Sequence, residues 1–224
     1  MRRFVRENGL TVFFSTILLL ALAGQSLVGM AEFNDQQLAA GQEPVSYGHY
    51  LLSSDFAVDV AENWQSEFLQ FTLYILATVY LVQVGSSESK KPEEVGLQSD
   101  EDQKVGRYAQ ADSPRWARSS GWRLGLYSRS LTLVMATIFA VSWLAQSIAG
   151  RAAYNGQQLT RYQDPLSWGN YVTSADFWSR TLQNWQSEFL AVAAMAVFAV
   201  YLRQRGSPES KPVGSPHTST GQEG

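Results

Sequence analysis

A seven-residue segment occurs twice in this chain of 224 residues, and this repetition constrains the fold more than any other feature. Asn63–Leu69 returns unchanged as Asn184–Leu190, 121 positions later. It lies inside a gap-free internal repeat, in which residues 25–90 align with residues 146–211 and roughly half of the positions are identical. In both copies an apolar run precedes and follows the polar centre. The sequence therefore predicts one supersecondary unit that is used twice.

Four apolar runs give the expected fold class. The runs cover residues 10–30, 68–84, 130–150 and 189–202. A helix of about 20 apolar residues crosses a hydrocarbon core of about 30 Å. Such runs could also be buried in a soluble core, but four of them in so short a chain would leave almost nothing to cover them. We expect an all-α integral membrane protein with four transmembrane helices.

The first run has an alternative interpretation as a cleavable signal peptide. Three arginines precede it, and Ala21-Leu22-Ala23 stands before Gly24, which is typical of a cleavage site. The repeat argues against cleavage, because residues 131–146 hold the same place in the second copy, where no signal peptide can be. We therefore expect residues 10–30 to remain as a span.

The basic residues predict how the spans are oriented. Most lysines and arginines lie in the N-terminal segment, the central linker and the tail, whereas the first outer loop has none. Because Lys/Arg bias places such segments in the cytoplasm, both termini should be cytoplasmic, and the two units form a parallel tandem repeat of helical hairpins. The first repeat is expected at residues 1–84, with spans at about 10–30 and 65–84 and an outer loop at 31–64. A linker at 85–123 follows it. The second repeat is expected at 124–205, with spans at about 128–150 and 184–204 and an outer loop at 151–183, and residues 206–224 form a tail.

The linker and the tail are rich in Ser, Glu, Lys and Gln and lack apolar periodicity, so we expect both to be largely disordered. Gly85-Ser86 and Gly206-Ser207, each followed by Glu-Ser-Lys, are expected to close their helices, because glycine accepts the left-handed backbone just past a helix end. A solvated tether is favoured there over a docking motif. Arg115, Trp116, Arg118, Trp122 and Arg123 suggest a lipid-surface approach to the third span.

The outer loops are too long for simple turns, and each repeats a pattern of Pro, Ser, Gly and aromatic residues. Ser53 and Ser54, like Ser174, are candidate N-caps for a helix that runs into the following span. The aromatic residues could form an interfacial belt or line an outward-facing pocket, and the belt is favoured. The candidate aromatic cap consists of Tyr47, Tyr50, Trp64, Trp168, Tyr171 and Trp185.

A polar cluster is expected where the outer loops enter the membrane. At 100° per residue, Asn63 and Glu67 share one helical stripe, and Asn184 and Glu188 repeat it. Glutamines at the outer ends of the partner spans lie at a comparable depth, so Gln25 should approach Asn63 and Glu67, and Gln146 should approach Asn184 and Glu188. Ionisable groups inside a membrane are costly and mark functional sites by default, although a polar clamp that fixes helix pairing is an equally good explanation. One hypothesis is that Glu67 and Glu188 face each other and bind a proton or a cation.

The spacing Pro-x-Ser-aromatic-Gly-x-Tyr-x-x-Ser, followed by Asn-Trp-x-Ser-Glu-Phe-Leu, resembles a family of small bacterial integral membrane proteins of unknown function. Gln25-Ser26 and the Gly-Ser-x-Glu-Ser segment after the second span match it too. The resemblance covers both copies but not the linker or the tail. It implies a bacterial plasma membrane location and assigns no role to any residue.

The remaining composition narrows the function classes. The chain has no cysteine and only two histidines, which excludes disulfides and thiolate sites and makes a histidine-based metal site improbable. We expect no metal, no cofactor and no nucleic-acid partner. The favoured function is a non-enzymatic, membrane-embedded binding or structural protein whose partners are the lipid bilayer and either a second copy or another membrane protein. The alternative is a small proton or cation transporter or channel that uses the repeated glutamates.

Overall fold

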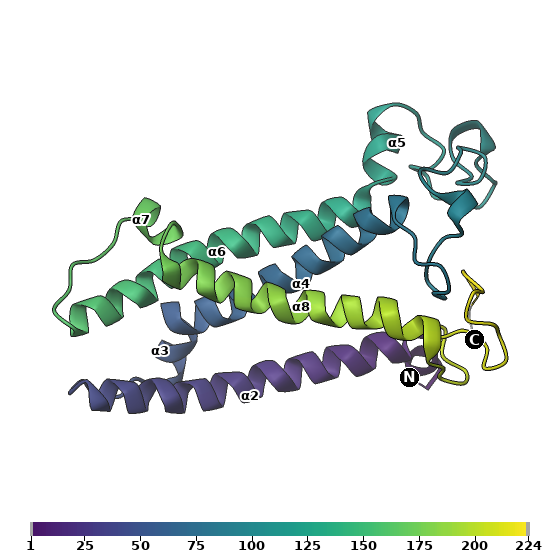
Figure 1. Cartoon of the computed structure of the whole chain (residues 1–224). Coiled ribbons are helices and arrows are strands. Elements are labelled where there is room, and N and C mark those ends of the chain that lie inside the picture. Colours follow the sequence, from purple (N-terminus) through teal and green to yellow (C-terminus); the bar gives the residue numbers. More distant parts are fainter. Residues whose placement is uncertain (1, 223–224) are drawn as a thin grey trace. The chain divides into compact units, whose positions relative to one another are not determined.

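The computed structural model describes residues 2–222, which contain helices and no strand (Figure 1). Four helices are long. They are α2 (Gly9–Ala39), α4 (Ser54–Tyr80), α6 (Ser130–Thr160) and α8 (Ala175–Tyr201). The short elements are α1 (Arg2–Glu7), α3 (Tyr47–Leu51), α5 (Trp122–Tyr127), α7 (Trp168–Val172) and the 3-10 helices η1 (Pro92–Glu94) and η2 (Gly106–Tyr108). The all-helical expectation is confirmed for this part of the chain.

The long helices continue beyond the spans that hydropathy outlined. α2 and α6 run on through polar residues to Ala39 and Thr160, so much of each predicted outer loop is helical. At the other end, α4 stops at Tyr80 and α8 at Tyr201, a few residues before the predicted boundaries. The physical reason is that hydropathy marks where apolar composition ends, whereas a helix continues until a turn stops it.

The same kind of turn ends both α2 and α6. Gly41 has φ +72°, and the N–H of Gln42 donates to the carbonyl of Gln37 at 2.8 Å. In the second copy Tyr162 has φ +56°, and the N–H of Gln163 donates to the carbonyl of Gln158 at 2.9 Å. Each is a Schellman turn, which requires one residue in the left-handed region. Glycine satisfies this without strain, whereas a tyrosine there is strained.

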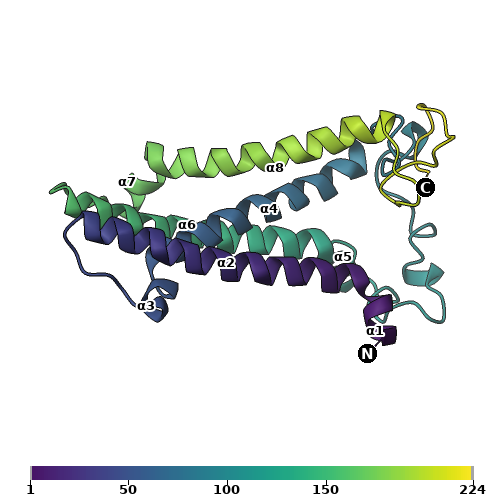
Figure 2. The ribbon, with the colours of Figure 1, turned by 90° about the horizontal axis from the view of Figure 1, so that it is seen from below.

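Serine side chains start both of the following long helices. The N–H of Phe56 donates to Oγ of Ser53 at 3.2 Å, and the N–H of Phe177 donates to Oγ of Ser174 at 3.3 Å. Each bond satisfies one of the free N–H groups of a first helical turn. The predicted caps at Ser53 and Ser174 are confirmed. Just before each cap stands a short helix, α3 or α7, as Figure 2 shows.

After α4 and α8 the chain folds into two hooks of the same kind, defined as residues 83–90 and 204–211. Ser89 caps the first by accepting the N–H of Gln83 at 2.8 Å, and Ser210 caps the second by accepting the N–H of Gln204 at 2.9 Å. Gly85 and Gly206 have φ +91° and +79°. The predicted left-handed glycines are confirmed, but they lie several residues beyond the helix ends rather than just past them.

The chain divides into two compact units. Unit 1 comprises the residues up to Ala61 together with Ala145–Phe177, and unit 2 comprises Glu62–Leu144 together with the residues from Trp178 onward. Unit 1 thus holds α1, α2, α3 and α7, together with the C-terminal part of α6 and the N-terminal turns of α4 and α8. Unit 2 holds the remaining parts of those helices, the linker and the tail.

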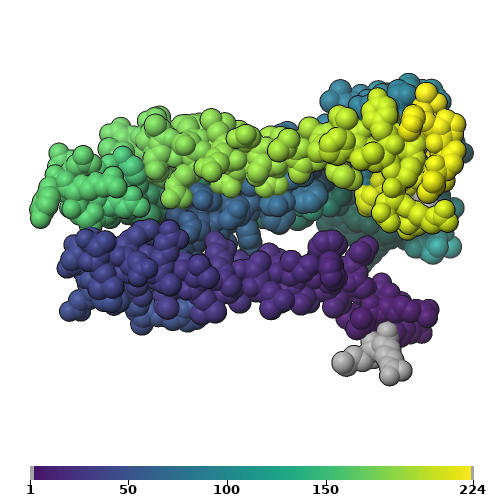
Figure 3. All heavy atoms as spheres, turned by 60° about the horizontal axis from the view of Figure 1, so that its bottom comes forward, coloured from purple at the N-terminus to yellow at the C-terminus, as the bar shows by residue number. Residues whose placement is uncertain are grey.

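Two helices are long and apolar enough to cross a membrane by length and composition. These are α2 and α6, and only 6% of the most apolar stretch of α2 and 17% of that of α6 is buried. Figure 3 shows the side chains of α2, in purple and dark blue, exposed along the helix. The exposed large apolar side chains of α2 include Phe14 and Leu18, which are 62% and 51% exposed.

Candidate functional site

In each copy, one aromatic side chain links the short helix, α3 or α7, to the preceding long helix, α2 or α6. In the first copy the hydroxyl of Tyr47 lies 2.7 Å from Oγ of Ser26. In the second, Nε1 of Trp168 donates to Oγ of Ser147 at 3.0 Å. Ser26 and Ser147 are buried, whereas Tyr47 and Trp168 are 41% and 47% exposed. Tyr47 and Trp168 therefore lie partly at the surface, and the polar end of each side chain bonds to the preceding helix. We call residues 26–56 and 147–177, which contain these contacts, the two caps.

A second tie uses an asparagine amide as a two-point clamp on the backbone. Nδ2 of Asn34 donates to the carbonyl of Val45 at 3.1 Å, while Oδ1 accepts the N–H of Val45 at 2.8 Å. Asn155 makes the same pair of bonds with Leu166, at 3.0 and 2.8 Å. An amide can both donate and accept, which is what a peptide unit outside regular structure needs. The two clamps fix where each loop leaves its helix.

Tyr50 and Tyr171 fill the interiors of the two caps. They are 2% and 1% exposed, and each ring lies between two other aromatic rings at centroid distances of 5.5–5.7 Å. The neighbouring rings are Phe33 and Phe56 in the first copy, and Tyr154 and Phe177 in the second. Each hydroxyl reaches over a glycine, Gly29 or Gly150, at a distance that leaves no room for a Cβ atom. These two tyrosines are core residues of the caps.

The electrostatic setting of Tyr50 follows from this burial. Burial raises the pKa of Tyr50 above its usual value, and the charges of Asp59, Asp55 and Glu32 raise it further. All three carboxylates disfavour a second negative charge beside them. Tyr171 differs, because its hydroxyl donates to Oδ2 of Asp176 at 3.1 Å. Burial and these charges thus favour the neutral, protonated form of Tyr50.

The predicted polar site is divided between the two units. Gln25 and Gln146 belong to unit 1, whereas Asn63, Glu67, Asn184 and Glu188 belong to unit 2. The expected approach of the glutamines to the other four residues runs between the units and stays a prediction.

Burial along α4 follows a different face from the Asn63–Glu67 stripe. Asn63 and Glu67 are exposed, whereas Gln65 is 0% exposed. The buried residues of α4 are Val58, Ala61, Gln65, Ser66 and Thr72. Most of these recur at steps of three, four or seven, which is the spacing of one helical face. Comparison of the two copies alone could not show this face, because most of its residues differ between them.

Gln65 is the centre of a contact that sequence comparison did not single out. Nε1 of Trp185 donates to Oε1 of Gln65 at 2.9 Å, and Nε2 of Gln65 is buried without a hydrogen-bond partner in the described part of the chain. Trp185 also belongs to an aromatic cluster with Trp143 and Trp178, at centroid distances of 5.9 and 6.5 Å. Trp64, its repeat partner, is 43% exposed and packs on Phe68. The two tryptophans of the repeated segment therefore have different surroundings.

An ion pair lies on unit 2 near these residues. Nη1 of Arg180 lies 3.0 Å from Oε2 of Glu62. Both line a polar depression of about 490 Å³ together with Gln183, Asn184 and Ser187. The pair is partly exposed, so it contributes little to stability, on the order of 1 kcal/mol or less. Its repeat partners are Gln183 and Asp59, which cannot form a second ion pair.

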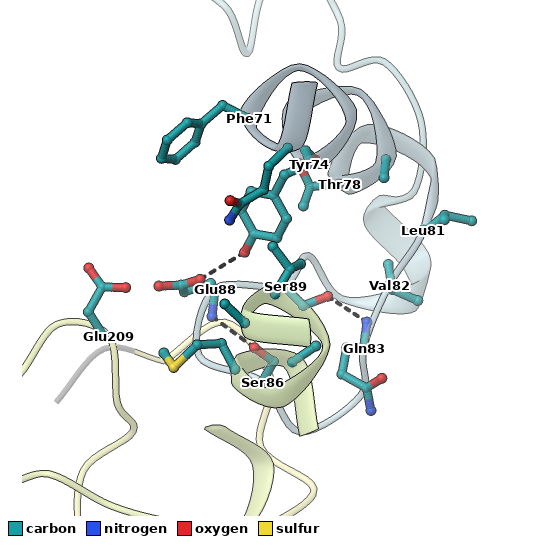
Figure 4. A pocket seen from close by; sticks show the side chains of 16 residues that line it. Phe71, Tyr74, Thr78, Leu81, Val82, Gln83, Ser86, Glu88, Ser89 and Glu209 are labelled. Atoms are coloured by element: carbon teal, nitrogen blue, oxygen red, sulfur yellow. Dashed lines mark hydrogen bonds between the residues drawn. The ribbon is translucent and has the colours of Figure 1, made fainter. Parts of the chain in front are cut away.

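A larger cavity, of about 600 Å³, lies in unit 2 between the inner halves of α4 and α8 (Figure 4). The hydroxyl of Tyr74 donates to Oε2 of Glu88 at 2.8 Å across its wall. Phe71, Thr78, Met195 and Glu209 also line it. The sequence indicated only sparse polar groups in these inner halves, and the cavity could not be predicted because Glu88 and Glu209 lie outside the helices.

Residues 2–222 contain no group of three or more His, Asp or Glu side chains that could hold a metal ion. A family described as a domain of unknown function (DUF6766) matches residues 1–222. No curated protein and no solved structure matches the chain.

Proposed function

The chain belongs to this family of unknown function, and we propose from its own residues that it is a four-helix integral membrane protein with a non-enzymatic binding or structural role. In this proposal α2, α4, α6 and α8 cross the membrane as two tandem hairpins. The tandem arrangement is supported by the pairs of equivalent contacts in the caps. The serine, asparagine and tyrosine contacts of residues 26–50 recur 121 positions later.

The observation that carries the proposal is the exposed apolar surface of α2 and α6. Almost none of the most apolar part of either helix is covered by the protein. In water, exposed apolar area costs about 25 cal/mol per Å², so a surface of this size needs a cover. A hydrocarbon layer covers it without further protein. The apolar side chains in the C-terminal half of α4, such as Leu73 and Leu76, and those of α8, such as Leu190 and Phe198, extend the same argument to the other two spans.

The orientation follows from the basic residues. The N-terminal segment, the linker and the tail together carry most of them, and we place all three on the cytoplasmic side of a bacterial plasma membrane with the two caps outside. The partners are the lipid bilayer and either a second copy of the chain or another membrane protein. The caps are the surfaces that such a partner would meet outside the membrane.

Introduced cysteines test the topology, because the natural chain has none. Gln42→Cys and Gln163→Cys mark the two caps, and Glu94→Cys and Thr218→Cys mark the linker and the tail; all four side chains are exposed. In intact spheroplasts, a membrane-impermeant maleimide should label the two cap variants, and it should label the other two only after permeabilisation. Labelling of the linker from outside, or release of the protein by alkaline carbonate, would overturn the proposal.

A second candidate is proton or cation transport, favoured by the two repeated glutamates, Glu67 and Glu188, which lie in the same unit. The discriminating variants are Glu67→Gln and Glu188→Gln in proteoliposomes that contain a pH-sensitive dye. A structural clamp tolerates these changes with little loss of folding, whereas transport depends on the carboxylates. Flux by the natural protein that both variants abolish would make transport the leading function. Equal dye signals from protein-containing and empty vesicles would remove it.

A further inference from the structure

The 600 Å³ cavity between the inner halves of α4 and α8 has the features of a ligand site. Its volume falls within the range of about 300–1,000 Å³ that is typical of small-molecule pockets. All of its lining residues belong to unit 2. An inference drawn from it goes beyond the proposed membrane role and does not depend on how many helices cross the bilayer.

The walls of the cavity are mainly apolar and partly aromatic. Its apolar lining residues include Phe71, Leu81, Val82, Val192 and Met195. The Phe71 ring is 45% exposed, so it is available for contact with a ligand. Such walls favour a ligand with an apolar body, and the face of an aromatic ring also attracts a cation.

The charged groups of the cavity are of one sign. Glu88 and Glu209 line it, and among the described residues that line it there is no Lys, Arg or His. The two glutamates occupy equivalent positions in the two hooks, yet both contribute to this single cavity. Glu88 and Glu209 are themselves exposed, and a ligand beside two carboxylates is favoured when it carries a positive charge, because opposite charges attract.

Two neutral polar groups add to the preference of the cavity for a positively charged ligand. The Tyr74 hydroxyl donates to Oε2 of Glu88, which holds that carboxylate in place, as Figure 4 shows. Oε1 of Gln70 is buried with no hydrogen-bond partner in the described part of the chain, and Gln70 lines the same cavity. An oxygen without a donor is a negative end of a dipole. It therefore favours a cationic or N–H-bearing ligand over an anion.

We propose that this cavity binds a monovalent organic cation with an apolar, aromatic body, held between Phe71 and the carboxylates of Glu88 and Glu209. The apolar walls cover the body of the ligand, and the two glutamates compensate its charge. The alternative occupant is a lipid acyl chain, which would use the same walls without the carboxylates. The two occupants differ in their dependence on charge, and this difference decides the experiment.

The test uses tetraphenylphosphonium and tetraphenylborate, which have the same shape and opposite charge. Binding of each ion is measured by equilibrium dialysis against the full-length protein in nanodiscs of uncharged phosphatidylcholine, with empty nanodiscs as the blank. We expect saturable binding of the cation and no saturable binding of the anion. Absence of saturable cation binding, or equal binding of both ions, would overturn the proposal.

Two variants locate the binding. Glu88→Gln with Glu209→Gln should weaken cation binding by about tenfold or more, which corresponds to the loss of a modest charge interaction. The matched control, Glu93→Gln with Glu94→Gln, changes two exposed linker glutamates that do not line the cavity and should leave affinity within about twofold. Unchanged affinity in the first double variant would contradict the role of the carboxylates.

Ala196→Phe supplies an independent check that keeps both carboxylates. Ala196 lines the cavity, and a phenyl group there would occupy part of its volume. Cation binding should fall strongly, while size-exclusion profile and helical circular dichroism stay as in the natural protein. Full affinity in this variant would place the ligand outside the cavity.

Discussion

Residues 26–56 and 147–177 make equivalent contacts, whereas the long helices that follow them bury different faces. In both caps a buried tyrosine crosses a glycine of the preceding helix, and an asparagine clamps the loop. Further along, Gln65 is completely buried, but its repeat partner Gln186 is exposed. Likewise, Ala61 is 8% exposed, whereas its repeat partner Leu182 is 52% exposed.

The difference can be traced to the residues that surround each segment. Contacts inside a cap span a few turns of one copy, so equal sequences give equal contacts. The faces of α4 and α8 depend on which helix lies opposite, and the two copies do not have the same neighbours. Val58 illustrates this, because it packs against Gly150 of the other copy in unit 1. Identical segments are thus equivalent only where their surroundings are supplied by the repeat itself.

The largest expected effect comes from truncating the glutamine that is buried in one copy only. Gln65→Ala removes a buried side chain and leaves the Trp185 indole without its acceptor, so we expect a loss of about 2–4 kcal/mol in unfolding free energy. Gln186→Ala, at the exposed equivalent, should stay within about 0.5 kcal/mol of the natural protein. Thermal unfolding in detergent, followed by tryptophan fluorescence, measures both. Equal losses in the two variants would show that the copies are equivalent here.

The glycines under the cap tyrosines should give the next largest effect. A Cβ atom at Gly150 would meet the Tyr171 ring and Cγ2 of Val58, both at 3.2 Å, whereas the three atoms nearest to a Cβ at Gly29 all belong to the flexible Tyr50 side chain. Gly150→Ala should therefore cost about 1–3 kcal/mol, and Gly29→Ala less. Gly156→Ala and Gly24→Ala are matched controls, because a Cβ there has nothing within 4 Å. The same thermal assay applies, and a larger loss at position 29 than at 150 would refute the asymmetry.

Substitutions at the turns that end α2 and α6, Gly41→Tyr and Tyr162→Gly, should change the free energy of unfolding by smaller amounts and in opposite directions. Tyr162 holds a left-handed backbone and its side chain is fully exposed, so Tyr162→Gly should stabilise the protein by about 1 kcal/mol. Gly41→Tyr should destabilise it by a similar amount. Chemical denaturation of both variants checks the signs. Destabilisation by Tyr162→Gly would mean that contacts of the tyrosine outweigh its strain.

The smallest effect is confined to alkaline pH. The pKa of Tyr50 is raised in the folded protein, so its contribution to stability is complete below the unfolded value of about 10 and is lost as pH rises through the folded value. Unfolding measured between about pH 8 and 11 should therefore show a steeper alkaline loss in the natural protein than in Tyr50→Phe. A pH dependence that is the same for both proteins would exclude Tyr50 as its source.

The sequence predicted those parts of the fold that depend on nearby residues. The all-helical class followed from the apolar runs, and the caps at Ser53 and Ser174 followed from residue type and position. The left-handed glycines of the hooks followed from their lack of a side chain. Helix ends were predicted less well, because α2 and α6 continue through polar residues until a turn stops them.

The candidate sites show the same limit. Asn63 and Glu67 stood out because they repeat, yet the buried contact of α4 is made by Gln65. The cavity beside Tyr74 joins residues from α4, α8 and both hooks, which no local pattern connects. The sequence by itself determined the repeat, the helices and the contacts within each cap, since these need only neighbours along the chain. The tertiary structure alone decided which faces are buried and which distant glutamates share a cavity, because burial depends on the helix that lies opposite.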